Sequence, residues 1–212
     1  VPADIVEGQI RAVLDDIGAK AIKIGMLQSA DIVHLIARLI KEYDIRNVVL
    51  DPVMVSTSGH RLIEETAISA LQTELIPLTR VITPNIPEAE ILLDGNAITL
   101  QEDMPQAVKA LSQRYHTSVL LKAGHLTEDN LVDYFYDAEQ DELTLLPSVR
   151  VHTRNTHGTG CTMSSAFATL LAQGNTLQQS AKGAKEYISQ AIIAGADYDI
   201  GKGHGPVNHF FR

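Results

Sequence analysis

Short apolar runs typical of β-strands alternate with helical patterns along most of the chain, and this alternation constrains the fold more than any other feature. The four runs span residues 21–25, 47–53, 80–83 and 118–122. The run at 47–53 is almost continuously apolar, as expected of a central parallel strand buried on both faces. Parallel strands joined by helices need right-handed crossovers, which place helices on both faces of the sheet. The sequence therefore predicts an α/β fold of three layers, αβα, with a mainly parallel central sheet.

Helical patterns fill the spaces between these runs. The second one covers 31–43, with five residues inward at helical spacing: Ile32, Leu35, Ile36, Leu39 and Ile40. A third one passes through Ile68, Leu71 and Leu75. Three more span 105–115, 160–173 and 176–194. Segments 131–137 and 143–149 are strand-like and are separated by a short polar stretch, which predicts a hairpin. No linker or repeat interrupts the pattern, so we expect one domain over residues 1–212.

The first helical pattern lacks a preceding strand. Its apolar residues fall on one face: Val6, Ile10, Val13, Leu14 and Ile17. Such a helix normally lies on a sheet, so we expect an N-terminal part to be missing. Without that part, the helix must cover the remaining sheet or lie partly bare.

Charge and cysteine content exclude several classes of protein. The 212 residues hold 17 Lys+Arg and 26 Asp+Glu, a net charge of −9 without basic blocks, which argues against nucleic acid as a partner. No apolar run approaches the roughly 20 residues that cross a bilayer. The single cysteine, Cys161, cannot form a disulfide within the chain, which favours a reducing compartment. We therefore expect a cytoplasmic protein without a membrane partner.

The most informative motif is the glycine-rich stretch 155–162, which leads into a predicted helix. Its glycines, Gly158 and Gly160, let backbone amides around Thr159 converge, and the helix start adds positive charge. This pattern suits a phosphoryl group. No Gly-Lys-Ser/Thr follows, so the stretch is not a Walker A loop, and the third glycine of a dinucleotide fingerprint is absent. The alternative is a tight turn with a small buried cysteine.

Cys161 follows these glycines at the predicted helix start. A helix N-terminus favours the thiolate form of a cysteine, and a thiolate there can accept a proton from a substrate hydroxyl. The alternative is an inert cysteine of the core.

Polar residues close three of the predicted strands. Asp51 ends an apolar run, a costly place for a carboxylate without a partner. Asn85 and Glu88 share one face of a helical turn and can hold hydrated Mg²⁺, or they can simply cap the helix. Lys122 is a candidate phosphate contact, or a lysine that reaches solvent.

Taken in order, six motifs resemble those of the hydroxymethylpyrimidine/phosphomethylpyrimidine kinases of thiamine synthesis, within the ribokinase-like superfamily. They span nearly the whole chain: Lys23-Ile24-Gly25-Met26-Leu27, Val49-Leu50-Asp51-Pro52-Val53-Met54, Thr83-Pro84-Asn85-Ile86-Pro87-Glu88-Ala89, Lys122-Ala123-Gly124-His125, His157-Gly158-Thr159-Gly160-Cys161-Thr162 and Gly203-His204-Gly205-Pro206-Val207-Asn208-His209.

The resemblance implies an enzyme that uses ATP and Mg²⁺ to phosphorylate a pyrimidine hydroxymethyl group and then the resulting monophosphate. It implies Cys161 as the base within the turn of Gly158, Thr159 and Gly160. By the same resemblance, Met26 and Val53 contact the pyrimidine, and Lys122 and Lys185 contact ATP. The magnesium site consists of Asp51, Asn85 and Glu88. The resemblance also implies a homodimer.

Two other functions remain open from the sequence. A pyridoxine or pyridoxal kinase shares the fold and an aromatic hydroxymethyl substrate. A non-catalytic ligand-binding member of the fold would keep the pocket alone. The family begins with a strand and a glycine-rich segment that helps to enclose the pyrimidine, and neither precedes the first helix here. We therefore expect the chain to be N-terminally incomplete relative to the family.

Overall fold

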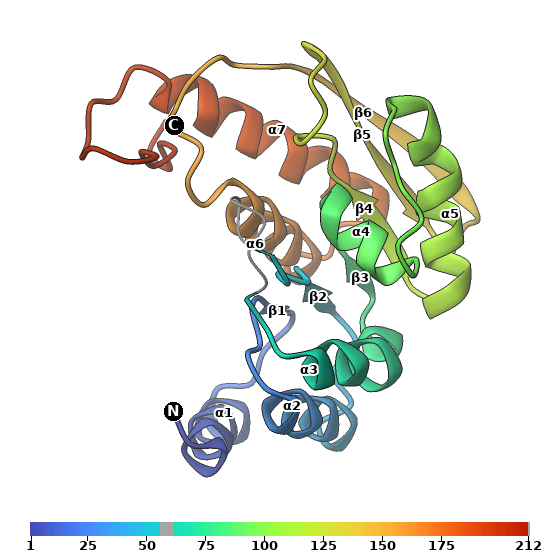
Figure 1. Cartoon of the computed structure of the whole chain (residues 1–212). Helices are drawn as coiled ribbons and strands as arrows, with labels where there is room; N and C mark the ends of the chain where they lie inside the picture. The colour runs from blue at the N-terminus through green and yellow to red at the C-terminus, as the bar shows by residue number, and fades with distance from the viewer. Residues whose placement is uncertain (56–61, 212) are drawn as a thin grey trace.

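One six-stranded sheet organises the part of the chain that the computed structural model describes, residues 1–55 and 62–211 (Figure 1). The strands are β1 (Ile22–Ile24), β2 (Val48–Leu50), β3 (Val81–Ile82), β4 (Ser118–Leu121), β5 (Asn130–Asp137) and β6 (Glu142–Val149), and they lie in that order. β1 to β4 are parallel to one another, whereas β5 and β6 continue the sheet antiparallel. The predicted parallel sheet and hairpin are both confirmed.

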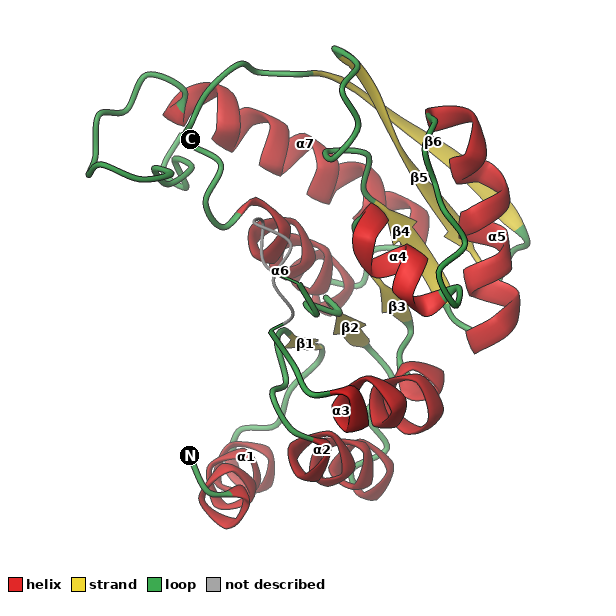
Figure 2. Cartoon of the chain, viewed as in Figure 1, coloured by secondary structure: helices red, strands yellow, loops and turns green. Residues whose placement is uncertain are grey.

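Helices cover both faces of this sheet (Figure 2). They are α1 (Ala3–Asp16), α2 (Ala30–Glu42), α3 (Glu65–Ala70), α4 (Ile86–Leu92), α5 (Met104–Tyr115), α6 (Thr159–Ala172) and α7 (Leu177–Gly195). α6 and α7 pack on one face against Val49, Val81 and Leu120. α2 to α5 pack on the other face, so the predicted three-layer arrangement is confirmed. None of the described helices has the length and apolar character needed to span a membrane.

The parallel strands are shorter than the sequence predicts. β2 ends at Leu50, and the chain then turns, with the Val53 N–H donating to the Asp51 carbonyl at 2.8 Å. Pro52 has no N–H to continue the ladder, which explains the early end. β3 ends in the same way ahead of Pro84. The residues after each strand are thus freed from the sheet and can form a site at its carboxyl edge.

The segment after α3 also departs from the prediction of one regular helix. It widens into a π-helical turn at Leu71–Leu75 and then tightens into a 3₁₀ turn at Ile76–Leu78. Pro77 lies in that last turn and cannot donate the hydrogen bond of a continuing helix. Its apolar residues are still buried, so the inward face is as predicted.

α1 makes a polar contact with α2 rather than covering the sheet. Arg11 pairs with Glu42 at 2.6 Å, and Arg38 pairs with Glu7 at 2.8 Å. No residue of α1 is fully buried, and Val13 and Ile17 of its apolar face are exposed. Of the two arrangements expected for this helix, the partly bare one is observed.

Phe167 anchors α6 to the sheet and provides a test of this packing. Its ring is fully buried and lies 5.8 Å from the ring of Phe135 on β5. We expect Phe167→Ala to lower the free energy of unfolding by about 3–5 kcal/mol, because it leaves a cavity in the core. Urea unfolding measures this loss. The exposed Thr169→Ala on the same helix is the control and should stay within about 0.5 kcal/mol. A loss below about 1 kcal/mol in Phe167→Ala would contradict the packing.

Candidate active site

A buried ion pair joins the ends of β2 and β4. Lys122 Nζ lies 2.9 Å from Asp51 Oδ1, and both side chains are largely shielded from solvent. Thr83, which follows β3, donates its hydroxyl to the same oxygen of Asp51 at 3.1 Å. Three adjacent parallel strands therefore direct polar groups to one point, at the carboxyl edge where ligands of such sheets bind.

Electrostatics keeps Lys122 charged at this point. Burial by itself lowers the pKa of a lysine, but the carboxylates of Asp51 and Glu88 outweigh it and raise the pKa of Lys122 above its ordinary value. Lys122 is therefore a fixed cation at the carboxyl ends of the parallel strands. A buried cation of this kind is suited to the charge of a phosphate.

Asn85 and Glu88 form the capping box of α4. Asn85 Oδ1 accepts from the Glu88 N–H at 2.9 Å, and Glu88 Oε2 accepts from the Asn85 N–H at 2.8 Å. Glu88 also accepts a hydrogen bond from the backbone of Met54. The capping arrangement that the sequence left open is thus present. Burial raises the pKa of Glu88 to about 7, and Lys122 opposes that rise.

The same side chains offer oxygen donors to a cation. No group of three His, Cys, Asp or Glu side chains in the described residues forms a closed metal cage. Mg²⁺, however, keeps most of its water and needs only one or two carboxylates beside substrate phosphates. Lys122 and Thr83 contact Oδ1 of Asp51 rather than Oδ2, and Glu88 is close enough to interact electrostatically with Asp51. This donor set fits a hydrated Mg²⁺ ion.

The glycine-rich turn faces this ion pair. Gly158 has φ +83°, a left-handed conformation that favours glycine, and α6 begins at the next residue. A Cβ atom built on Gly160 would lie 3.2 Å from Lys122 Nζ and 3.6 Å from Asp51 Oδ2. The first turn of α6, whose N–H groups have no partners within the helix, therefore lies against Lys122 and Asp51. The structure brings together two motifs that lie far apart in the sequence.

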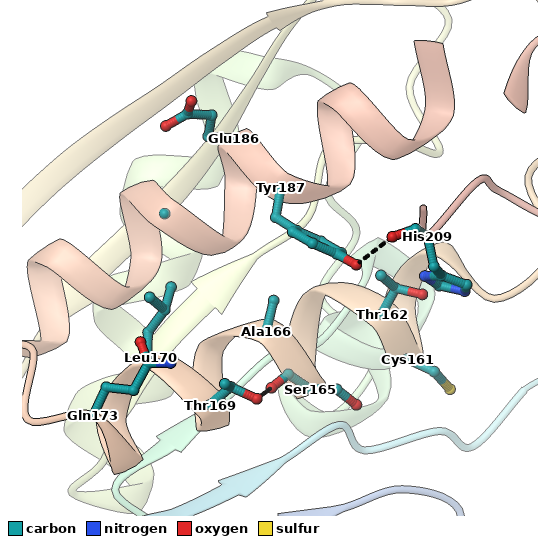
Figure 3. Close-up of a pocket in the computed structure, with 11 residues that line it drawn as sticks. Cys161, Thr162, Ser165, Ala166, Thr169, Leu170, Gln173, Glu186, Tyr187 and His209 are labelled. Carbon is teal, nitrogen blue, oxygen red and sulfur yellow. Dashed lines mark hydrogen bonds between the residues drawn. The ribbon is translucent and has the colours of Figure 1, made fainter. Parts of the chain in front are cut away.

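Cys161 lies in this first turn and is exposed, so it is not the buried core residue of the alternative interpretation. It stands at one end of a groove of about 650 Å³ that runs along α6 and α7 (Figure 3). Near that end, the Tyr187 hydroxyl donates to the carbonyl of His209 at 3.2 Å (Figure 3). The thiol is accessible to a ligand bound over the carboxyl edge of the sheet.

Lys185 of α7 is engaged in a second buried ion pair. Its Nζ lies 2.6 Å from Asp133 Oδ2 on β5. Asp133 Oδ1 accepts from the N–H of Ala123, directly after Lys122, at 2.7 Å. The sequence analysis missed Asp133 and Thr83. A charged residue within the apolar segment 131–137 is the signal that could have indicated Asp133.

Met26 and Val53 follow β1 and β2 at the same edge of the sheet. Met26 is about half exposed, at 51%, and Val53 is partly buried. Of the residues that the sequence predicted for the site, Asp51, Lys122 and the glycine-rich turn meet directly. Met26 and Val53 follow strands at the same edge of the sheet. Their contact with a pyrimidine stays a prediction.

Comparison with known proteins gives the family. The profile of phosphomethylpyrimidine kinases matches residues 1–208. The hydroxymethylpyrimidine/phosphomethylpyrimidine kinase of Rhizobium meliloti is 44% identical over 213 residues, which cover all of this chain and 79% of that protein. The chain belongs to this kinase family. The Escherichia coli protein of the same name is 36% identical over 210 residues, covering 99% of this chain and 78% of its own.

Solved structures agree on the ribokinase-like fold. The ADP complex of Bacillus subtilis pyridoxal kinase superposes with a TM-score of 0.89 at 35% identity, covering 99% of this chain and 77% of that one. The phosphomethylpyrimidine kinase of Clostridium difficile superposes at 0.78 with 36% identity, covering 91% and 77%. The expected ribokinase-like fold and the membership of a phosphotransferase family are confirmed.

The raised pKa of Glu88 predicts how stability depends on pH. The pKa of Glu88 in the folded chain is about 7, against an ordinary value of 4.5 for a glutamate, so the folded state holds this proton more tightly than the unfolded state. The contribution of Glu88 to stability is therefore fullest at acid pH and is lost as the pH rises from about 4.5 to about 7. We expect Glu88→Gln, which keeps the size and a hydrogen-bond acceptor, to remove this loss.

Urea unfolding in EDTA at pH 5.0 and pH 7.5 measures the effect without metal. Relative to Glu88→Gln, the free energy of unfolding of the wild-type chain should fall by roughly 2–3 kcal/mol from pH 5.0 to pH 7.5. An equal difference between the two chains at both pH values would contradict the raised pKa.

Proposed function

We propose that this chain catalyses the ATP-dependent phosphorylation of 4-amino-5-hydroxymethyl-2-methylpyrimidine and then of its monophosphate, in thiamine biosynthesis. The observation that carries the proposal is the placement of the glycine-rich start of α6 against the Lys122–Asp51 pair. Phosphoryl transfer depends on positioning and charge stabilisation, which this placement supplies. The relatives' names give the substrate class.

Lys122 and the first turn of α6 stabilise the transferred group. The amides around Gly158, Thr159 and Gly160 bind the phosphoryl oxygens as they gain charge, and Lys122 neutralises the ATP phosphates. Asp51 fixes Lys122 by the 2.9 Å contact, so the cation does not have to be reorganised during the reaction.

Cys161 acts as the general base. Its thiolate accepts the proton of the substrate hydroxymethyl group while the oxygen attacks the γ-phosphorus of ATP. The bond from that phosphorus to the β,γ-bridging oxygen breaks, and ADP leaves. The exposed thiol at the helix start is accessible to that hydroxyl. Mg²⁺, when bound, shields the negative charge of the phosphates. Asp51, Asn85 and Glu88 would hold it, with water completing its coordination.

The remaining contacts complete the proposal. Met26 and Val53 contact the pyrimidine ring from the ends of β1 and β2. Lys185 lies near the nucleotide. Its ion-pair partner, Asp133, also accepts a hydrogen bond from the N–H of Ala123, directly after Lys122. We place the enzyme in the cytoplasm as a homodimer. These assignments follow from the resemblance together with the positions of the residues at the carboxyl edge of the sheet.

A pyridoxal kinase is the second candidate, and one observation favours it. The ADP complex of the Bacillus subtilis pyridoxal kinase superposes more closely than the Clostridium difficile phosphomethylpyrimidine kinase. Measuring ATP turnover with the pyrimidine alcohol and with pyridoxal separates the two activities. Nucleotide binding by calorimetry, with no ADP formed from ATP in the presence of either alcohol, would instead identify a non-catalytic binding member of the fold.

The role of Cys161 predicts a loss of turnover. We expect Cys161→Ala to reduce kcat by roughly 10²–10⁴-fold with nucleotide affinity nearly intact, because only proton transfer is removed. Cys161→Ser should be similarly impaired, since a hydroxyl is a poor base near neutral pH. Ser165→Ala, one turn along the exposed side of α6, is the control. Turnover of Cys161→Ala near the wild-type value would return this residue to a structural role.

The magnesium site predicts a change in metal dependence. Glu88→Gln removes the charge that helps to hold hydrated Mg²⁺. We expect this variant to need several-fold more Mg²⁺ for half-maximal ATP turnover. Glu102→Gln, which removes an exposed carboxylate on the 3₁₀ turn at Gln101–Asp103, serves as the control for the loss of one negative charge. An unchanged magnesium titration in Glu88→Gln would leave Glu88 as a helix-capping residue alone.

A further inference from the structure

One motif singled out in the sequence has no part in the proposed chemistry: the C-terminal stretch 203–209. The structure brings it against the segment that enters the glycine-rich turn. The N–H of His157 donates to the carbonyl of Gly205 at 3.0 Å, and His157 pairs with Pro206 as in a short parallel bridge. The entry to the turn is therefore held by residues near the end of the described chain.

Asn155 is the centre of this contact. Its side chain is buried, and Nδ2 lies within hydrogen-bond distance of three backbone carbonyls, those of Gly195, Ala196 and Tyr198, at 2.9, 3.0 and 2.8 Å. An amide NH₂ group has two hydrogens, so three acceptors exceed its capacity for separate bonds. One side chain thus gathers the end of α7 and the loop that follows it.

The oxygen of the same amide faces the C-terminal stretch. Among the described residues, Asn155 Oδ1 is buried and has no hydrogen-bond partner. A Cβ atom built on Gly205 would lie 2.0 Å from this oxygen, so only glycine fits at that position. The end of α7 is equally close to the stretch, because a Cβ atom on Gly195 would lie 2.8 Å from the backbone nitrogen of Asn208.

We infer that Asn155 is a positioning residue for phosphoryl transfer, which ties α7 and the C-terminal stretch to the glycine-rich turn and so aims the first turn of α6 at Lys122. The inference rests on the proposed function for its kinetic consequence. It goes beyond that function because Asn155 lies three residues before Gly158 and has no role in the proposed chemistry. A misplacement of the turn by an ångström is enough to lower a rate by about 10²-fold.

A graded set of substitutions tests the inference. Asn155→Ala removes the three side-chain hydrogen-bond contacts of Asn155. Thr153→Val is milder: it removes the hydroxyl that donates to Ala196 at 2.7 Å and accepts from the Asn155 N–H at 3.1 Å. Asp199→Asn is the matched control. It breaks the exposed ion pair of Arg154 and Asp199, which joins the same two segments at the surface.

Two readouts separate positioning from mere stability. The first is kcat against KM for ATP: we expect kcat to fall about 10–100-fold in Asn155→Ala, less in Thr153→Val, and KM to change less than threefold.

The second is alkylation of Cys161 by iodoacetamide well below the melting temperature. Since Cys161 is the only cysteine, the reaction reports on the first turn of α6 alone. We expect its rate to fall at least threefold in Asn155→Ala and to stay within twofold in Asp199→Asn, because a displaced first turn would take the exposed thiol out of its position at the end of the groove.

The alkylation measurement needs no kinase activity. A wild-type chain that phosphorylates neither alcohol, together with slower alkylation in Asn155→Ala, would remove the proposed function and leave the positioning role supported. Alkylation of a folded Asn155→Ala within twofold of the wild-type rate would overturn the inference. If Asn155→Ala does not fold, Thr153→Val decides: slower alkylation supports the inference, and the wild-type rate overturns it.

Discussion

The buried ion pair of Asp51 and Lys122 is the interaction on which the site depends. A carboxylate removed from water costs several kcal/mol unless a partner and hydrogen bonds compensate it, and here Lys122 and Thr83 both contact Asp51 Oδ1. Such a pair contributes little net stability, so its presence at the carboxyl edge is better explained by function than by folding. It provides a fixed cation where phosphates would bind.

That ion pair also determines what can lie above it. The two glycines of the turn meet different demands. Gly158 has a left-handed backbone that favours glycine, whereas a side chain at Gly160 would crowd Lys122 and contact Asp51. Thr159 and Cys161 flank Gly160 and both carry side chains, and that of Cys161 is exposed. The small residue at position 160 thus suits the charges beneath the turn.

The sequence predicted the fold well because its strands are buried on both faces. Val48, Val49 and Leu50 form an apolar run with no polar side, which is typical of a central parallel strand. The lengths of the strands were less predictable, since Pro52 and Pro84 end the ladders early. Asp133 was missed because its two partners, Lys185 and the amide of Ala123, come from distant segments. Local pattern identifies a strand, but not which buried charges meet across it.

The same limit explains why the role of Asn155 was not apparent from the sequence. Its three carbonyl partners lie 40 to 43 residues further along the chain, and the close approach of Gly205 is a property of packed backbone. In the sequence, Asn155 is one polar residue in a polar loop. In the fold, its buried amide contacts the end of α7 and the loop that follows, three residues before the turn that leads into α6. A glycine-rich turn can be recognised from its own residues, but the direction in which it points is set by the far end of the chain.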